Sequence, residues 1–307
     1  MLAGVVEESS EERERWAAAQ LDRLATVLAG FDRHLDSVRG RRGHEAADGS
    51  LVAREIADEA SVATDDLRRP ILDAVGFATV RMVAGTDHFL TLAMAIKAPP
   101  RPFAPQTLAR QGVELAARAF DLLDPSIGPR ERAARFVTEL LDSLWETEQR
   151  GGEMDDGSAP AARVEILLRW AADMGVQVRE TRRGRYWVGE RDRLGSTRVI
   201  EAMMGDGVGT VGYAIYSAPA HGGIGGLADR LERSDREDAE EDLGAQISVS
   251  LGDVALLVSW VVTACLPAFK RYFEVHGWDD EMTLAWRHHA LKTAREVGEA
   301  AGVFRSR

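Results

Sequence analysis

The densest group of side chains able to accept, donate or relay a proton lies in YAIYSAPAHGGIGGL, residues 213–227. Tyr216, Ser217 and His221 fall within six positions, and four glycines follow, where backbone can approach a ligand or another helix closely. A histidine beside a hydroxyl group can act as a general base. The sequence therefore predicts a proton-transfer site with His221, Ser217 and Tyr216 as its catalytic candidates.

Four further polar residues are candidates for ligand binding. Arg110, Glu114 and Arg118 are spaced four apart, so they form one stripe on a helix. If the stripe points outward, it is an ion-pair ladder at a surface or interface, and this is the alternative that the pattern favours. If the stripe points inward, it would fix an anion or orient a base. Asp87 and His88 interrupt an apolar helix and could line a cavity. We expect Asp87, His88, Arg110 and Glu114 to complete the pocket around His221, although a buried structural histidine is the simpler interpretation.

Metal-ligand spacings are missing from the sequence. It has one cysteine and therefore no CxxC pair, and no two histidines are four residues apart. Acidic pairs such as Asp65-Asp66 fall at predicted helix ends, where caps and helix dipoles explain them. We accordingly expect no metal and no cofactor.

Charge and cysteine content restrict the function classes. The 307 residues carry a net charge of −12, which argues against a sequence-independent coat on nucleic acid. The lone Cys265 in an apolar run is typical of a buried thiol in a reducing cytoplasm. The longest apolar run, 254–266, is short for a bilayer span, so we expect a buried core helix, a cytoplasmic chain and no membrane partner.

The elements that must position these residues are mostly helices. Caps, apolar periodicity and proline stops predict a mostly α multi-helix bundle with a small β-hairpin insert, and with strand confined to 176–189. We expect an N-terminal helical half over 1–150 and a C-terminal helical half over 160–307, or one continuous domain. The expected helices span about 9–35, 50–69, 71–98, 105–124, 129–149, 161–174, 196–204 and 279–302. A core helix that includes 254–266 is expected to run to about 276, with a helix or turn over 208–217 and a solvated helix start in the acidic run 230–242.

Several segments resemble a family. DHFLTLAMAI (87–96), ARQGVELAARAFDLLDP (109–125), GPRERAARF (128–136), STRVIEAMM (196–204) and YAIYSAPAHGG (213–223) are together similar to an actinobacterial group of helical proteins related to HEPN-type domains. The resemblance implies a helical bundle. The catalytic members of the HEPN family carry an arginine that is followed, after four to six residues, by a histidine, and they cleave RNA as dimers.

Three pairs have that spacing: Arg39 and His44, Arg81 and His88, and Arg271 and His276. The resemblance therefore implies a ribonuclease, or an inactive relative that binds nucleotide or a protein partner, with RNA and a second copy of the chain as expected partners. The residues alone leave open a different class, a small-molecule enzyme of specialised metabolism that uses His221 as general base in a pocket between helices.

Overall fold

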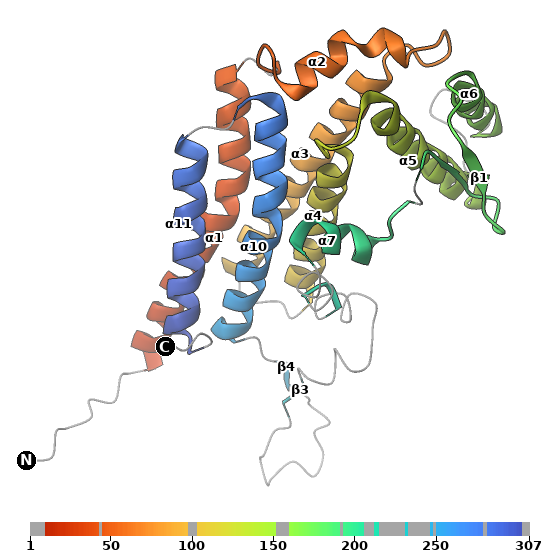
Figure 1. The fold of residues 1–307 in the computed structure, drawn as a ribbon. Helices are drawn as coiled ribbons and strands as arrows, with labels where there is room; N and C mark the ends of the chain where they lie inside the picture. The colour runs from red at the N-terminus through yellow and green to blue at the C-terminus, as the bar shows by residue number, and fades with distance from the viewer. Residues whose placement is uncertain are drawn as a thin grey trace, which may run out of the picture.

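The computed structural model shows a helical bundle with a small β-hairpin at its side (Figure 1). It describes residues 10–42, 45–97, 103–151, 160–190, 193–205, 212–214, 231–232, 246–247, 250–278 and 281–302. Helices α1, α10 and α11 lie side by side, α3 and α4 pack next to them, and α5, α6 and the hairpin lie at the opposite end. The predicted fold class is confirmed.

Most helices in the first half of the chain begin near the capping residues and prolines that predicted them. Its elements are α1 (Ser10–Arg42), α2 (Leu51–Ala57), the 3-10 helix η1 (Glu59–Ser61), α3 (Pro70–Lys97), α4 (Ala104–Leu122) and α5 (Pro129–Gln149). The side chain of Ser50 caps α2 by accepting a hydrogen bond from the amide of Ala53. Pro129 occupies the first turn of α5, where its missing N–H costs nothing. α1 extends to Arg42, past its predicted end at about Leu35.

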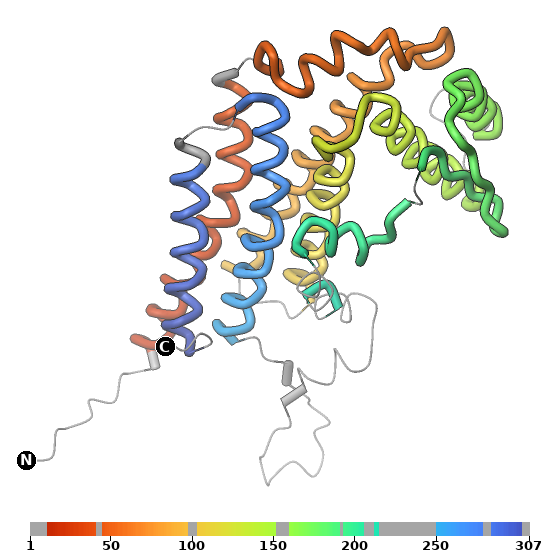
Figure 2. The backbone as a smooth tube through the Cα atoms, viewed as in Figure 1, coloured from red at the N-terminus to blue at the C-terminus, as the bar shows by residue number. Residues whose placement is uncertain are grey.

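The second half contains the hairpin and the core helix. Its elements are α6 (Pro160–Asp173), β1 (Val178–Glu180), β2 (Tyr186–Val188), α7 (Ser196–Met204), β3 (Leu231–Glu232), β4 (Gln246–Ile247), α10 (Leu251–His276) and α11 (Glu281–Ala300). Figure 2 follows this path along the backbone.

The β1–β2 hairpin confirms the expected strand region. β1 and β2 are antiparallel with Val178 opposite Val188, and Gly184 in the turn has φ 75°. The hairpin is fixed to α5, because Thr138 Oγ1 bonds both the amide and the carbonyl of Val188, at 2.9 and 3.0 Å.

The expectation that strand would be confined to 176–189 is wrong. β3 pairs antiparallel with β4, with Leu231 opposite Ile247. The start of the acidic run, where we expected a helix start, therefore contains strand residues. A ladder of two residues per strand is too short for alternation to reveal, which is why the pattern missed it.

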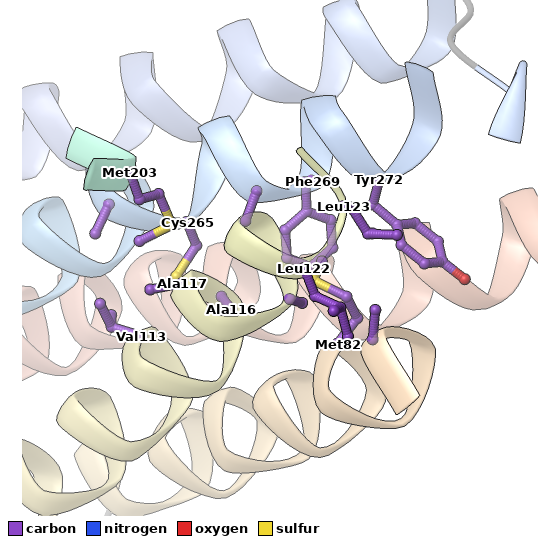
Figure 3. Packing of buried hydrophobic residues seen from close by; sticks show 14 of the residues in the cluster. Met82, Val113, Ala116, Ala117, Leu122, Leu123, Met203, Cys265, Phe269 and Tyr272 are labelled. Carbon is purple, nitrogen blue, oxygen red and sulfur yellow. The ribbon is translucent and has the colours of Figure 1, made fainter. Parts of the chain in front are cut away.

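Helix α10 supplies the centre of the core. A capping box between Ser250 and Asp253 begins it, and Gly277, with φ 70°, ends it. As expected, Trp260 and Cys265 are buried. Figure 3 shows Cys265 and Phe269 of α10 facing Ala116 and Ala117 of α4.

Buried apolar residues from both halves of the chain form one cluster. α10, from the second half, packs against α1 and α4 from the first, and α11 packs against α1 and α10. Within the described residues, α10 is the one helix whose length and composition would suit a membrane span, but most of its apolar stretch is buried in the bundle, as in core helices.

Helices α3 and α4 approach each other closely at two glycines. A Cβ on Gly85 would lie 3.2 Å from the carbonyl oxygen of Gly112, and a Cβ on Gly112 would overlap the ring of Phe89. The absence of side chains at these positions lets the helices pack at short distance. This contact fixes the position of the polar residues that α3 and α4 carry.

Candidate functional site

The three catalytic candidates, Tyr216, Ser217 and His221, lie outside the described residues. The segment that leads to them is described at residues 212–214 and is helical there. Its Tyr213 hydroxyl accepts a hydrogen bond from Nε of Arg110 at 3.3 Å, and the guanidinium lies 5.4 Å from the ring centroid. Arg110 of α4 therefore contacts the beginning of the predicted site, through a tyrosine we had not selected.

Asp87 and His88 lie on the outer side of α3. Asp87 is exposed and His88 is half-buried. Within the described part of the chain, neither side chain makes a hydrogen bond or ion pair, and no described contact joins them to Arg110 or Glu114. The two residues are thus available at the surface of the bundle.

Glu114 and Arg118 of the stripe form an ion pair that lies between helices of the fold and not at an open surface. The side chains of Glu114 and Arg118 are only 16% and 11% exposed, and they pair at 3.0 Å. Glu114 also accepts a hydrogen bond of 2.5 Å from the hydroxyl of Ser196, at the start of α7. The stripe points partly inward because α7 covers it, which helical periodicity alone cannot show.

A carboxylate that we had not selected, Glu139 of α5, lies at the centre of the resulting polar cluster. Its oxygens pair with Arg81 of α3 at 2.8 Å, with Arg193 at 3.1 Å and with Arg118 of α4 at 3.4 Å. Burial by itself would raise the pKa of Glu139, but the three guanidinium groups lower it to about 2. Glu139 is therefore ionised at neutral pH, so it cannot act as a general acid there, and its low pKa makes it a weak base.

The cluster continues to the hairpin through Asp142, one turn further along α5. Asp142 pairs with Arg193 at 2.6 Å and with Arg185 of the hairpin at 3.0 Å. Arg185 also lies 4.0 Å from the ring centroid of Trp145. The cluster thus joins α3, α4, α5, α7 and the hairpin by ion pairs and hydrogen bonds.

A cavity of about 20 Å³ lies beside this cluster. Its polar lining includes Arg118, Arg135, Arg193, Asp121, Thr138 and Glu139. This volume is close to the minimum that one water molecule needs. Arg135 is itself paired, with Glu131 at 3.0 Å and with Asp121 at 3.4 Å. The described cluster therefore fixes the packing of elements and offers little room for a substrate.

Arg81, Arg271 and His276, from the second and third Arg-to-His pairs, make their contacts inside the fold. Arg81 is buried and bonded to Glu139. Arg271 donates to the carbonyl of Phe120 at 2.8 Å and stacks 3.3 Å from its ring centroid. His276 is buried, with Nδ1 2.7 Å from the carbonyl oxygen of Tyr272, and burial lowers its pKa to about 4. His276 is therefore neutral at pH 7 and closed off from solvent; His44 of the first pair lies outside the described residues.

Among the described residues, the two most exposed large apolar side chains lie on α3. Val80, Val83 and Met94 are exposed, at 62%, 37% and 61%. Beside Met94, a groove of about 370 Å³ separates α3 from α1; its lining comprises Ala25, Thr26, Ala29, Arg33, Leu90, Ala93, Met94 and Lys97. Large apolar side chains that gather on one face of a helix indicate a binding surface more often than scattered ones do.

A second hollow, of about 470 Å³, is bordered by Trp16, Leu251, Leu256 and Ala300 at the end of the bundle where α10 begins.

Among the described residues, no group of three or more His, Cys, Asp or Glu side chains is arranged to hold a metal ion.

Sequence reasoning missed Glu139, Asp142 and Arg193. A weak signal existed for Glu139, because Arg132, Arg135 and Glu139 recur on successive turns of α5.

Comparison of the chain with known protein families, with curated proteins and with solved structures found no match.

Proposed function

We propose that this chain is a HEPN-like helical protein that does not cleave RNA and instead binds a protein partner through the outer face of α3. One observation carries the proposal. Three residues of the nuclease-like spacings, Arg81, Arg271 and His276, are bonded inside the fold. In contrast, α3 presents exposed apolar side chains, Val80, Val83 and Met94, on its outer face.

The internal contacts disfavour catalysis for physical reasons. A histidine that moves protons at neutral pH needs a pKa near the working pH and access to the substrate. His276 has neither, because it is buried and its pKa is about 4. Arg81 is held by Glu139, so its guanidinium is not free for a phosphate.

The surface of α3 favours a protein over RNA as the partner. Its exposed side chains between Val80 and Met94 are mainly apolar, and the chain as a whole is acidic. RNA binding depends on cationic groups that displace counterions, and such groups are not gathered on this stripe. The alternative, a small-molecule enzyme based on His221, depends on residues outside the described part of the chain.

Site-specific photo-crosslinking tests the proposal. A benzophenone amino acid is placed at Val80 and, as a matched control, at Ser143, an exposed position on α5. In cells of the native host, we expect a discrete protein adduct from position 80 and none from position 143. The absence of an adduct at position 80, an adduct that ribonuclease digests, or RNA cleavage by the purified chain that His276→Gln abolishes, would overturn it.

A further inference from the structure

We infer that the first two turns of α4 bind a small monocarboxylate that also carries a hydroxyl or amino group. Arg110 contacts the carboxylate of this ligand, and Gln106 contacts its hydrogen-bond donor. Three features of α4 point to such a ligand: a buried amide, an arginine without a counter-charge and a helix end without a cap. The site is separate from the outer face of α3 and does not depend on the protein partner proposed above.

Gln106 carries a buried acceptor that has no donor in the described part of the chain. The residue is only 4% exposed, and its Oε1 makes no hydrogen bond. An amide that gives up its contacts with water and gains no partner destabilises the fold, so buried polar groups of this kind are normally bonded. Oε1 of Gln106 therefore marks a place where a hydroxyl or ammonium group of a ligand can donate.

Arg110, one turn further along α4, has no counter-charge among the described residues. Glu114 has the right spacing for an ion pair with Arg110, but it is bonded to Arg118 at 3.0 Å and to Ser196 at 2.5 Å. Nε of Arg110 donates to the neutral hydroxyl of Tyr213 at 3.3 Å. The positive charge of this half-buried arginine is thus available for an anion.

The beginning of α4 is also suited to a negative group. Phe103, at the N-cap position, makes no capping hydrogen bond with its side chain, and the first turn contains no acidic residue. In contrast, the side chains of Ser50 and Ser250 cap α2 and α10. Free amides and the helix dipole at an uncapped end attract an anion. This end therefore adds to the attraction that Arg110 exerts.

The helix brings these groups together. Gln106 and Arg110 are four residues apart, about 6 Å along the axis, and lie on the same side of α4. Side chains on a helix lean toward its N-terminus, which carries the guanidinium of Arg110 back toward the turn of Gln106. Tyr213 holds this guanidinium, and its own position is fixed by Gly212, where a Cβ would lie 2.0 Å from the indole nitrogen of Trp260.

The charge of these groups selects the class of ligand. One guanidinium balances one negative charge, and the carboxylate of Glu114 on the next turn disfavours a second. A phosphate dianion would keep an unbalanced charge here, whereas a carboxylate matches a guanidinium both in charge and in bidentate geometry. The free acceptor on Gln106 requires a donor on the same molecule. A hydroxy or amino carboxylate meets both requirements.

Four small molecules of nearly the same shape test the inference on the unmodified chain. L-lactate and L-alanine carry both the carboxylate and a donor, propionate lacks the donor, and L-lactamide lacks the charge. In ligand-observed NMR without chloride, we expect lactate or alanine to bind, and the stronger of the two identifies the donor. Propionate should bind about two- to tenfold more weakly, the loss of one hydrogen bond, and lactamide should not bind.

Variants of Arg110 and Gln106 assign the contacts. Arg110→Gln should abolish the binding of lactate, alanine and propionate alike. The matched control is Arg198→Gln, which removes an exposed arginine from α7, the helix that packs against α4 (Figure 1), and should leave binding unchanged. Gln106→Leu should keep propionate binding and remove the advantage of the donor. Without ligand it should also raise the urea midpoint, because it replaces an unpaired buried amide with an apolar group of similar size.

Circular dichroism checks that each variant is folded, and the comparison of the four molecules needs no variant. Absence of binding by both lactate and alanine, propionate binding as strong as the better of these two, or binding that survives Arg110→Gln would overturn the inference. A Gln106→Leu chain with a lower urea midpoint would also contradict it, because the amide would then be a structural contact. The crosslink at Val80 is independent of all these results, so the proposed partner and this site are tested separately.

Discussion

The buried ion pair between Arg132 and Glu55 should be the most sensitive single contact of the described fold. Both side chains are nearly inaccessible, at 2% and 6% exposed. Arg132 donates from Nε to Glu55 at 2.5 Å and from Nη2 to the other carboxylate oxygen at 3.0 Å. It also donates to the carbonyls of Leu122 and Asp124, and so joins α2, the end of α4 and the start of α5.

Replacing Arg132 by methionine keeps much of the side-chain volume and removes every one of these donors. The carboxylate of Glu55 would then be buried without a counter-charge. Breaking one side of such a pair costs about 3–5 kcal/mol. For a chain of this size, that corresponds to a fall in Tm of roughly 5–10 °C.

The assay is urea unfolding followed by circular dichroism, with Arg150→Met as the control. Arg150 pairs with Glu146 at the surface, where its side chain is 79% exposed, so its removal should leave stability unchanged within error. The double variant Glu55→Leu/Arg132→Met removes the orphan charge. It should be more stable than Arg132→Met alone by about 2 kcal/mol or more.

Two results would refute this reasoning. One is a loss below about 1 kcal/mol for Arg132→Met, which would mean that water reaches the pair. The other is a double variant no more stable than the single one, which would show that the cost comes from packing and not from the unpaired carboxylate.

Three further predictions concern other parts of the fold. Gly112→Val should destabilise the protein by several kcal/mol in the same urea assay, because its side chain would overlap Phe89, whereas Gly128→Val, at an open position, should cost far less. Stability should fall by about 3 kcal/mol as pH drops from 6.5 to 4, because unfolding releases His276 from burial and lets it bind a proton, and His276→Gln should flatten urea midpoints across that window. Cys265, fully buried and with the pKa of its thiol raised by burial, should resist thiol reagents in the native chain and react only after unfolding; rapid labelling would contradict the core position of α10.

Local features of the sequence were enough to predict most helices. Ser50 and Pro129 act within one turn of the helix they begin, so their effect can be read without the rest of the fold. The burial of α10 follows in the same way from a run of apolar residues. Boundaries without such signals, such as the end of α1, were less accurate, because nothing local stops the helix at Leu35.

The candidate site was predicted less well. The spacing of Arg110, Glu114 and Arg118 correctly places them on one face of α4, but it does not determine whether that face meets solvent or another helix. The structure covers Glu114 and Arg118 with α7 and with Glu139. The three catalytic candidates, Tyr216, Ser217 and His221, remain predictions, because they lie outside the described residues.

The sequence by itself determined where most helices form and which stretch is most buried, because periodicity and caps act over a few residues. Only the tertiary structure decided that Arg81, Arg118 and Arg193 converge on Glu139. These residues are far apart in the chain and become neighbours through helix packing. The strength of an ion pair depends on the distance between the charged groups in space, and the order of residues along the chain does not specify that distance.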